Sequence, residues 1–223
     1  RLSYKIMNKT LETSYKNKRK NFDEDFRLRI HRAMSWLKRA QLAEEDHDTK
    51  FISLWIAFNA AYAKELMGER AIDKATFQVF IKTICELDST QSLQKAIWEK
   101  LPQSVTKLVQ NRYTYQPFWK FHNGQISKEV WLSQFNTQHQ IALTAIRNKN
   151  TRKLLIIVFE HLYILRNQII HGGATYNSIA NRTQLKEACE ILFTLIPLII
   201  SIMMDNPNTA WGKPFYPYIK ENK

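Results

Sequence analysis

Cysteine is scarce in this chain of 223 residues, which contains only Cys85 and Cys189. Both lie within apolar helical patterns, and neither has a second cysteine or a histidine at the spacing of metal ligands. This pattern excludes a disulfide-stapled secreted scaffold and a zinc module. We therefore expect a reduced, cytoplasmic protein that needs no metal and no other cofactor.

The chain also lacks runs in which β-branched residues alternate with polar ones, and it shows no internal repeat. Glycine and proline are few, with 5 and 6 residues. Apolar residues recur instead at helical spacing over most of the length. These features exclude β-sandwiches, β-barrels and repeat arrays, and they predict an all-α fold in one domain with tails.

No apolar run is long enough to span a membrane. The longest, Ile191 to Met204, contains Pro197 and falls short of the roughly 20 residues that a span requires. The basic N-terminal residues have no apolar face to lie on a bilayer. We expect the run to be a buried core helix and expect no membrane partner.

Acidic residues are outnumbered: 20 Asp and Glu face 33 Lys and Arg, which gives a formal net charge of +13. The calculated pI is near 9.7. Such a charge favours a polyanionic partner, and RNA is the one expected here. The alternative is a basic surface with no dedicated partner.

The helical pattern divides the chain into an arm, a domain and a tail. Residues 1–21 carry seven basic residues and one acid and are expected to form a partly disordered basic arm. The helical domain is placed at 22–205, with a large helical insertion at about 68–147, and a tail at 206–223 is expected to pack on the bundle. Helices are predicted at 23–43, 50–66, 73–87, 91–99, 102–110, 128–146, 151–171 (with Thr151 as N-cap) and 184–204, with a kink at Pro197.

A loop at 111–125 mixes aromatic and cationic residues. Aromatic rings stack on bases and cations contact phosphates, so Arg112, Tyr113, Trp119 and Lys120 are candidate RNA-binding residues. The same aromatic residues are equally suited to pin a long loop to the core. The sequence leaves both interpretations open.

The stretch YILRNQIIHGG, residues 163–173, places three polar residues in the last turns of an apolar helix. Asn167 and His171 are four apart and share a face, about 40° from each other. Arg166 is five before His171 and about 140° away. Its guanidinium therefore meets the imidazole only by curling, by local distortion or across a symmetric partner.

Arginine and histidine together suit phosphodiester chemistry without a metal. The 2′-hydroxyl of RNA is a built-in nucleophile, so a histidine that moves a proton and an arginine that stabilises the charged phosphorane suffice. Asn167 is placed to orient the imidazole or to hold a phosphate oxygen. The spacing alone is a weak signal, because a histidine followed by glycine is also an ordinary helix ending.

Other polar residues in the helices have a structural interpretation. Asn59 interrupts an apolar helix and should find a hydrogen-bond partner inside the bundle, since an unmatched buried amide costs about 1 to 3 kcal/mol. His31 and His161 are expected to be structural or surface residues.

Four segments together resemble the HEPN superfamily, and most closely its Apea-like branch. They are SWLKRA at 35–40, FISLWIAFNAAY at 51–62, LRNQIIHGG at 165–173 and WGKPFYPYI at 211–219. The resemblance spans most of the chain but leaves the insertion at about 68–147 unexplained.

The resemblance implies an up-and-down helical bundle that forms a homodimer through the helix carrying the Arg-X4-His motif. It implies a metal-independent endoribonuclease with Arg166 and His171 as the catalytic pair and Asn167 as the polar residue that follows the arginine. The expected products are a 2′,3′-cyclic phosphate and a 5′-hydroxyl. The expected settings are toxin-antitoxin, phage-defence or stress systems, with an antitoxin or defence protein as a further partner.

One departure from the family pattern concerns regulation. One toxin branch often has a tyrosine two residues after the histidine, whereas this chain has Gly173 there and its nearest tyrosine is Tyr176. The superfamily also includes members that are not enzymes. The alternative is therefore a noncatalytic module that binds RNA or a partner protein.

Overall fold

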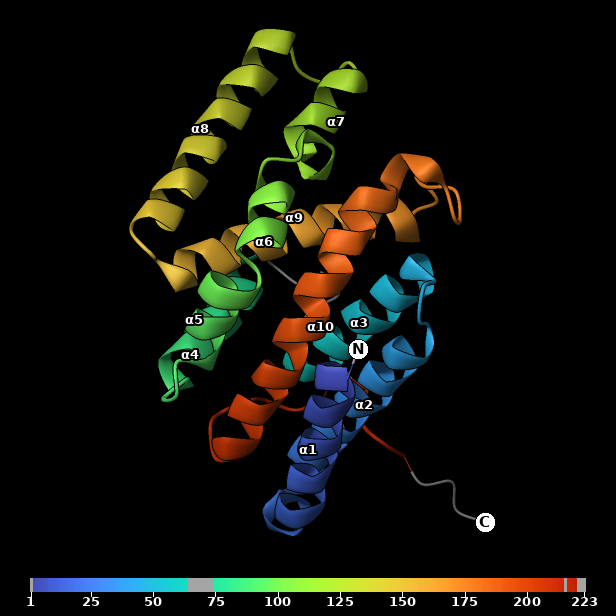
Figure 1. Ribbon diagram of the computed structural model, residues 1–223, viewed down its shortest axis with the longest axis vertical. Coiled ribbons are helices and arrows are strands. Elements are labelled where there is room, and N and C mark those ends of the chain that lie inside the picture. Colours follow the sequence, from blue (N-terminus) through green and yellow to red (C-terminus); the bar gives the residue numbers. More distant parts are fainter. Residues whose placement is uncertain (1, 64–73, 215, 220–223) are drawn as a thin grey trace.

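The computed structural model describes residues 2–63, 74–214 and 216–219, and every regular element among them is helical (Figure 1). The α-helices are α1 (Leu2–Lys18), α2 (Glu24–Leu42), α3 (His47–Tyr62), α4 (Lys74–Leu87), α5 (Ser92–Lys95), α6 (Pro102–Val109), α7 (Gln116–His122), α8 (Lys128–Arg147), α9 (Thr151–Ile170) and α10 (Arg182–Asp205). Short helical turns are η1 (Arg19–Asn21), η2 (Ala96–Lys100), η3 (Arg112–Thr114) and η4 (Ile179–Asn181). The all-α prediction is confirmed.

Helices α2 and α3 form a tightly packed hairpin, and side-chain caps explain where each begins. Asp23 accepts a hydrogen bond from the Phe26 amide at 2.8 Å, and Asp46 accepts one from the Thr49 amide at 2.9 Å. Such caps satisfy amides that have no partner within the helix. Helix α3 ends at Tyr62, so the predicted helix over 50–66 is too long at its end, where residues 64–66 lie outside the described residues.

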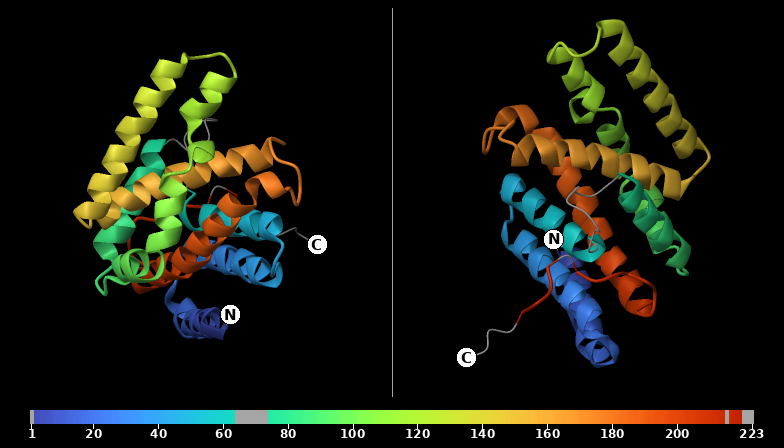
Figure 2. Two further views of the ribbon diagram at one scale, coloured as in Figure 1. Left: turned by 45° about the horizontal axis from the view of Figure 1, so that its top comes forward. Right: turned by 180° about the vertical axis from the view of Figure 1, so that it is seen from behind.

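Helix α10 is the centre of the bundle. From Ile191 to Met204 it is apolar on nearly all sides, and the helix contacts α1 to α6 and α9 (Figures 1 and 2). Because apolar side chains surround this part of the helix, it is stable only when other helices cover it. It continues through Pro197 and is long and apolar enough to cross a bilayer, but 83% of its most apolar window is buried inside the protein. The predicted core helix is confirmed.

Helix α1 differs from the predicted basic arm. Residues 2–18 are helical, and Leu11 and Tyr15, four apart on one face, are buried. The helix packs against α10, and Tyr15 lies 6.5 Å from the ring of Phe22. Two buried apolar residues in a helix are a weak signal in the sequence. They are enough to hold α1 in place here because α10 offers an apolar surface for them to pack against.

Arg29 fastens the C-terminal tail to the hairpin. Its side chain is 1% exposed and donates to the carbonyl oxygens of Ala61 (3.0 Å), Ala63 (2.6 Å) and Gly212 (3.0 Å). Burial lowers the pKa of this guanidinium to about 10. Nearby Trp211 is also buried, so the start of the tail packs on the bundle.

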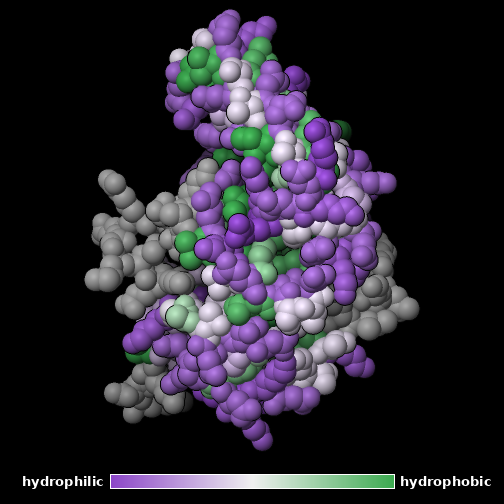
Figure 3. Space-filling model, turned by 90° about the vertical axis from the view of Figure 1, so that its left-hand side faces the viewer, coloured by the Kyte–Doolittle hydropathy of each residue, from purple (hydrophilic) through white to green (hydrophobic). Residues whose placement is uncertain are grey.

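The predicted insertion behaves as two parts, and its residues 68–73 lie outside the described residues. Helices α4 to α6 supply core residues such as Ile81, Ile97 and Leu108 and pack against α9 and α10. Helices α7 and α8 pack on each other and form a hairpin that projects beyond α9 (Figures 1 and 2). Seen from the side, polar side chains cover most of this face, with small apolar patches between them (Figure 3).

Candidate active site

The candidate site lies where α9 ends. The helix begins at an Asn150 cap, whose side chain accepts from the Lys153 amide at 3.0 Å. The prediction of Thr151 as the cap is wrong by one residue, because the Thr151 hydroxyl instead accepts a hydrogen bond from the Trp98 indole at 2.8 Å. The helix is 20 residues long and ends at Ile170, and His171 is its C-cap.

Both glycines after His171 are required by the way α9 stops. Gly172 has a φ of +73°, which is the left-handed region that favours glycine. Its amide donates to Ile169 at 3.2 Å and the Gly173 amide donates to Gln168 at 2.6 Å, the two bonds of a Schellman motif. A Cβ on Gly173 would lie 3.0 Å from the Gln168 carbonyl oxygen. The left-handed glycine expected from the sequence is confirmed.

Arg166 and Asn167 are joined to each other. The Nη1 atom of Arg166 donates to Oδ1 of Asn167 at 2.9 Å, and its guanidinium carbon lies 6.0 Å from the centre of the Tyr163 ring. The Nε atom of Arg166 is buried and has no hydrogen-bond partner. Asn167 therefore orients the guanidinium, and the remaining donors stay available for a ligand.

A second unpaired polar atom lies beside Arg166. Oδ1 of Asn59, on α3, is buried without a partner, so the expectation that Asn59 is satisfied inside the bundle is wrong. Asn59 and Arg166 line one small cavity of about 70 Å³, together with Trp55 and apolar side chains of α3 and α9. A buried acceptor and a buried donor at one cavity are the surroundings that hold a water molecule or a polar ligand atom.

His171 stands apart from this pair within one chain. Its side chain is exposed, and among the described residues nothing hydrogen-bonds its imidazole. The structure thus joins Arg166 to Asn167 and leaves His171 on the same helix end without contact to either side chain. This agrees with the wheel geometry, in which the arginine and histidine of one helix point apart.

The loop after the glycines is anchored to the turn between α2 and α3. Asp48 is buried and accepts from Arg182 at 2.8 Å and from the Asn177 amide at 3.2 Å. Asp46 accepts from the Tyr176 hydroxyl at 3.1 Å. These acids hold the segment that follows His171, and their role was not foreseen because it depends on two segments about 130 residues apart.

The candidate RNA-binding residues lie on η3 and α7. Arg112 covers the Tyr113 ring at 5.1 Å, and Trp119 donates to the Tyr113 carbonyl at 2.8 Å. Gln168 of α9 donates to the same carbonyl at 2.5 Å, so this cluster borders the end of α9. Lys120 is exposed on α7, outside this cluster, where it is accessible to a ligand.

The other aromatic residues of this segment support the structural alternative. Phe118 and Trp131 are buried and meet edge to face at 5.3 Å, which holds α7 against α8. The segment therefore combines a buried aromatic core with an exposed cationic rim at Arg112 and Lys120.

Neither cysteine is an activated nucleophile. Burial raises the pKa of Cys85 to about 11 and that of Cys189 to about 12. A thiol must lose its proton to attack or to bind metal. Among the described residues no group of three or more His, Cys, Asp or Glu side chains is placed to hold a metal ion.

Comparisons with known family models, with curated proteins and with solved structures each find no match to this chain.

Proposed function

We propose that this protein is a metal-independent endoribonuclease of the HEPN type that acts as a homodimer. The observation that carries the proposal is the arrangement at the end of α9, where Asn167 orients Arg166 and His171 is exposed at the same helix end. The net charge of +13 and the resemblance of the four sequence segments support the same proposal.

Each residue has one role in this proposal. The 2′-oxygen of RNA attacks the adjacent phosphorus, the bond to the 5′-oxygen breaks, and a 2′,3′-cyclic phosphate and a 5′-hydroxyl form. His171 accepts the proton of the 2′-hydroxyl, and the second His171 of the dimer protonates the departing oxygen. Arg166 stabilises the charge on the phosphorane, and Asn167 holds Arg166 in place.

The dimer explains why one chain keeps Arg166 and His171 apart. Around Arg166 lie half-buried Ile52 and Ile56, and the neighbouring Tyr163 and Ile170 are 40% and 48% exposed. A second copy placed on this face buries the apolar side chains and brings its own motif alongside. In that arrangement the two motifs form one site.

The setting proposed from the resemblance is a toxin-antitoxin, phage-defence or stress system. A partner protein that masks the α9 end would then control the activity.

The decisive test is incubation of the purified protein with total RNA in EDTA, followed by end-group analysis of the fragments. The wild type should leave cyclic phosphate and 5′-hydroxyl ends, and His171→Ala should leave the RNA intact. The control is His31→Ala, which removes an exposed histidine from α2. Undiminished cleavage by His171→Ala would contradict the proposal.

A mixed dimer tests whether the site is shared. Wild-type chains are mixed with chains carrying His171→Ala, and because one site uses the histidines of both chains, cleavage should fall with the square of the wild-type fraction. A fall in direct proportion to the wild-type fraction would contradict a shared site. RNA binding without turnover by the wild type would instead favour the noncatalytic module.

A further inference from the structure

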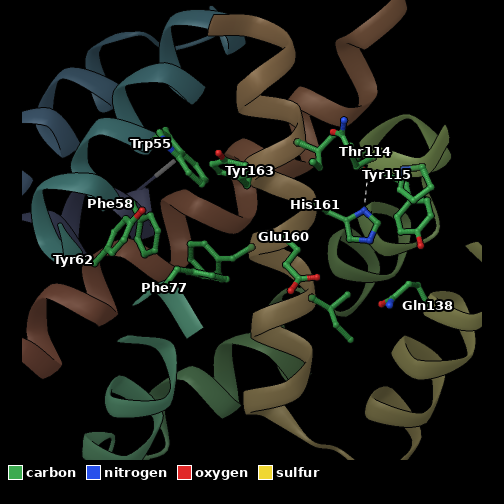
Figure 4. A pocket seen from close by; sticks show the side chains of 15 residues that line it. Trp55, Phe58, Tyr62, Phe77, Thr114, Tyr115, Gln138, Glu160, His161 and Tyr163 are labelled. Carbon is green, nitrogen blue, oxygen red and sulfur yellow. Dashed lines mark hydrogen bonds between the residues drawn. The ribbon is translucent and has the colours of Figure 1, made fainter. Parts of the chain in front are cut away.

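A cavity of about 430 Å³ opens beside the candidate site, between α3, α4, the turn after η3, α8 and α9 (Figure 4). This volume lies within the range of cavities that bind small molecules or single nucleotides. Trp55, Phe58, Phe77 and Tyr163 gather on one side, and the more polar Gln138 lies on the other (Figure 4). The cleavage chemistry proposed for Arg166, Asn167 and His171 does not use this cavity.

The aromatic side of the cavity presents flat rings to a ligand. Tyr163 is 40% exposed, and Trp55, which is only 5% exposed, supports it with a ring centre 6.2 Å away and a tilt of 51°. Phe58 and Phe159 are buried behind these two rings and contact each other, which prevents the rings from moving into the core. A planar ligand that enters the cavity therefore meets an aromatic surface, which is how proteins stack nucleobases.

Glu160 supplies the polar group between the two sides (Figure 4). It is half-buried, and Gln78 of α4 donates to its Oε1 atom at 3.3 Å, which helps to hold the carboxylate. Burial, together with the nearby charge of Glu160, raises the pKa of the neighbouring Tyr115 to about 12. An ionised carboxylate only accepts hydrogen bonds, so it selects a ligand that offers donors.

Among the RNA bases, guanine matches a carboxylate best. Its N1–H and its exocyclic amino group stand side by side and can donate to both oxygens of one carboxylate. Uracil presents a single N–H between two carbonyl oxygens, which the carboxylate repels. Adenine and cytosine each offer an amino group beside an acceptor nitrogen, so they form one good hydrogen bond instead of two.

The position of Arg166 argues for an anionic ligand over a cationic one. Aromatic rings and a carboxylate also suit a cation. However, the Arg166 guanidinium lies 6.0 Å from the Tyr163 ring, and Trp55 lines both this cavity and the small cavity at Arg166. Glu160 and Arg166 are six residues apart, or about 9 Å along the helix axis and about 120° around it, and Tyr163 lies midway between them. A nucleotide stacked on Tyr163 can thus place its base at Glu160 and direct its phosphate toward Arg166.

We infer that this cavity is a guanine-binding subsite, in which Glu160 reads the base edge and Tyr163, supported by Trp55, provides the stacking surface. If the subsite positions RNA, cleavage should occur at a fixed distance from guanosines, and this consequence rests on the proposed ribonuclease function. Binding of guanine to the cavity does not depend on that function.

The test measures binding separately from cleavage. Isothermal titration calorimetry with GMP and UMP compares the wild type with Glu160→Gln, which keeps the shape of the side chain. The wild type should bind GMP about tenfold more tightly than UMP, and Glu160→Gln should bind both equally. The matched control is Glu86→Gln, an exposed carboxylate on α4 that should retain the preference.

A second variant covers the case in which Glu160→Gln fails to fold. Tyr163→Ala removes an exposed ring and should weaken GMP and UMP by about tenfold each while keeping their ratio. Equal binding of GMP and UMP by the wild type, or an unchanged preference in Glu160→Gln, would overturn the inference. Tighter binding of spermidine than of GMP would also overturn it, in favour of a cation site.

Sequencing of the 5′-hydroxyl ends then connects the subsite to cleavage. Guanine should be enriched at one fixed position relative to the cut in wild-type digests and not in those of Glu160→Gln. Preferential GMP binding without any cleavage supports the subsite and contradicts the ribonuclease. Cleavage with no base preference, together with equal nucleotide binding, supports the ribonuclease and contradicts the subsite.

Discussion

Two histidines on the same helix, ten residues apart, have opposite surroundings. His161 is buried in the middle of α9, and its Nδ1 atom lies 2.8 Å from the Thr114 hydroxyl. Because that hydroxyl donates to the Asn111 carbonyl at 2.9 Å, it accepts from Nδ1–H of His161. His171 ends the helix, exposed and without a side-chain partner among the described residues.

The same contrast holds for two arginines. Arg29 is buried and uses both of its Nη groups on backbone carbonyls of α3 and the tail. Arg166 is half-buried, and its Nη1 donates to Asn167. The Nε atom is buried without a partner in both arginines, so the difference lies in the Nη groups. Those of Arg29 are taken up by the protein's own backbone, whereas Nη2 of Arg166 has no hydrogen bond among the described residues and keeps capacity for another molecule.

The largest expected effect comes from His171→Ala. If the exposed histidine performs proton transfer, RNA cleavage should fall about a thousandfold while the melting temperature stays unchanged. The measurement is cleavage of a labelled RNA beside thermal unfolding followed by circular dichroism. A variant that melts much earlier would show that His171 is structural like His161.

Arg29→Met should have the largest effect on stability. It leaves several buried carbonyls of α3 and the tail without a donor, so the free energy of unfolding should fall by about 3 kcal/mol. Urea unfolding measures this, with Arg27→Met as an exposed control on the same helix. Cleavage per folded molecule should not change, and a selective loss of cleavage would break the contrast between the two arginines.

The pH dependence of stability isolates His161. Burial lowers its pKa from 6.5 to about 4 in the folded protein. The unfolded chain therefore binds the proton first, and the stabilising contribution is complete above about pH 6.5 and is lost as the pH falls toward 4. Between pH 7 and pH 5 the wild type should lose about 2 kcal/mol more than His161→Gln, which does not titrate. Parallel pH profiles in urea unfolding would contradict this account.

Asp48→Asn should have the smallest effect. It removes the charge that holds Arg182, so we expect a loss of about 1 kcal/mol, together with faster hydrogen exchange at the Asn177 amide. Asp205→Asn is the control, because that residue pairs with Lys18 on the surface and such pairs contribute little. Equal exchange in the two variants would show that the loop after His171 does not depend on Asp48.

Helix positions were largely predictable, and the failures have local causes. The apolar periodicity of α2, α4, α8 and α10 marks each to within a few residues, because one face of each must be buried. Helix α7 was predicted as part of a loop, because it has only seven residues and its first turn contains Pro117, which also suits a loop. The burial of Arg29 could not be read from the sequence, because a periodic pattern does not reveal where the unpaired carbonyls of another helix lie.

Part of the candidate site was also predictable from the sequence, and part was not. Asn167 and His171 share a face, and the two glycines end the helix, for reasons contained within a stretch of seven residues. From the sequence, Asn167 was expected to contact either the imidazole of His171 or a phosphate oxygen. In the structure its side chain accepts a hydrogen bond from Arg166 instead. Asn59 was expected to have a hydrogen-bond partner inside the bundle. In the structure its side-chain oxygen has none, and the residue lines the small cavity between α3 and α9.

The sequence by itself determined the helical class, the ending of α9 and the basic charge, because these depend on residue types and on spacing along one segment. Only the tertiary structure decided that Trp55 of α3, Phe77 of α4 and Glu160 of α9 meet around one cavity, and that the loop after His171 is tied to Asp46 and Asp48. Local patterns specify which face of a helix is apolar, but side-chain packing between distant segments selects the neighbour that covers it.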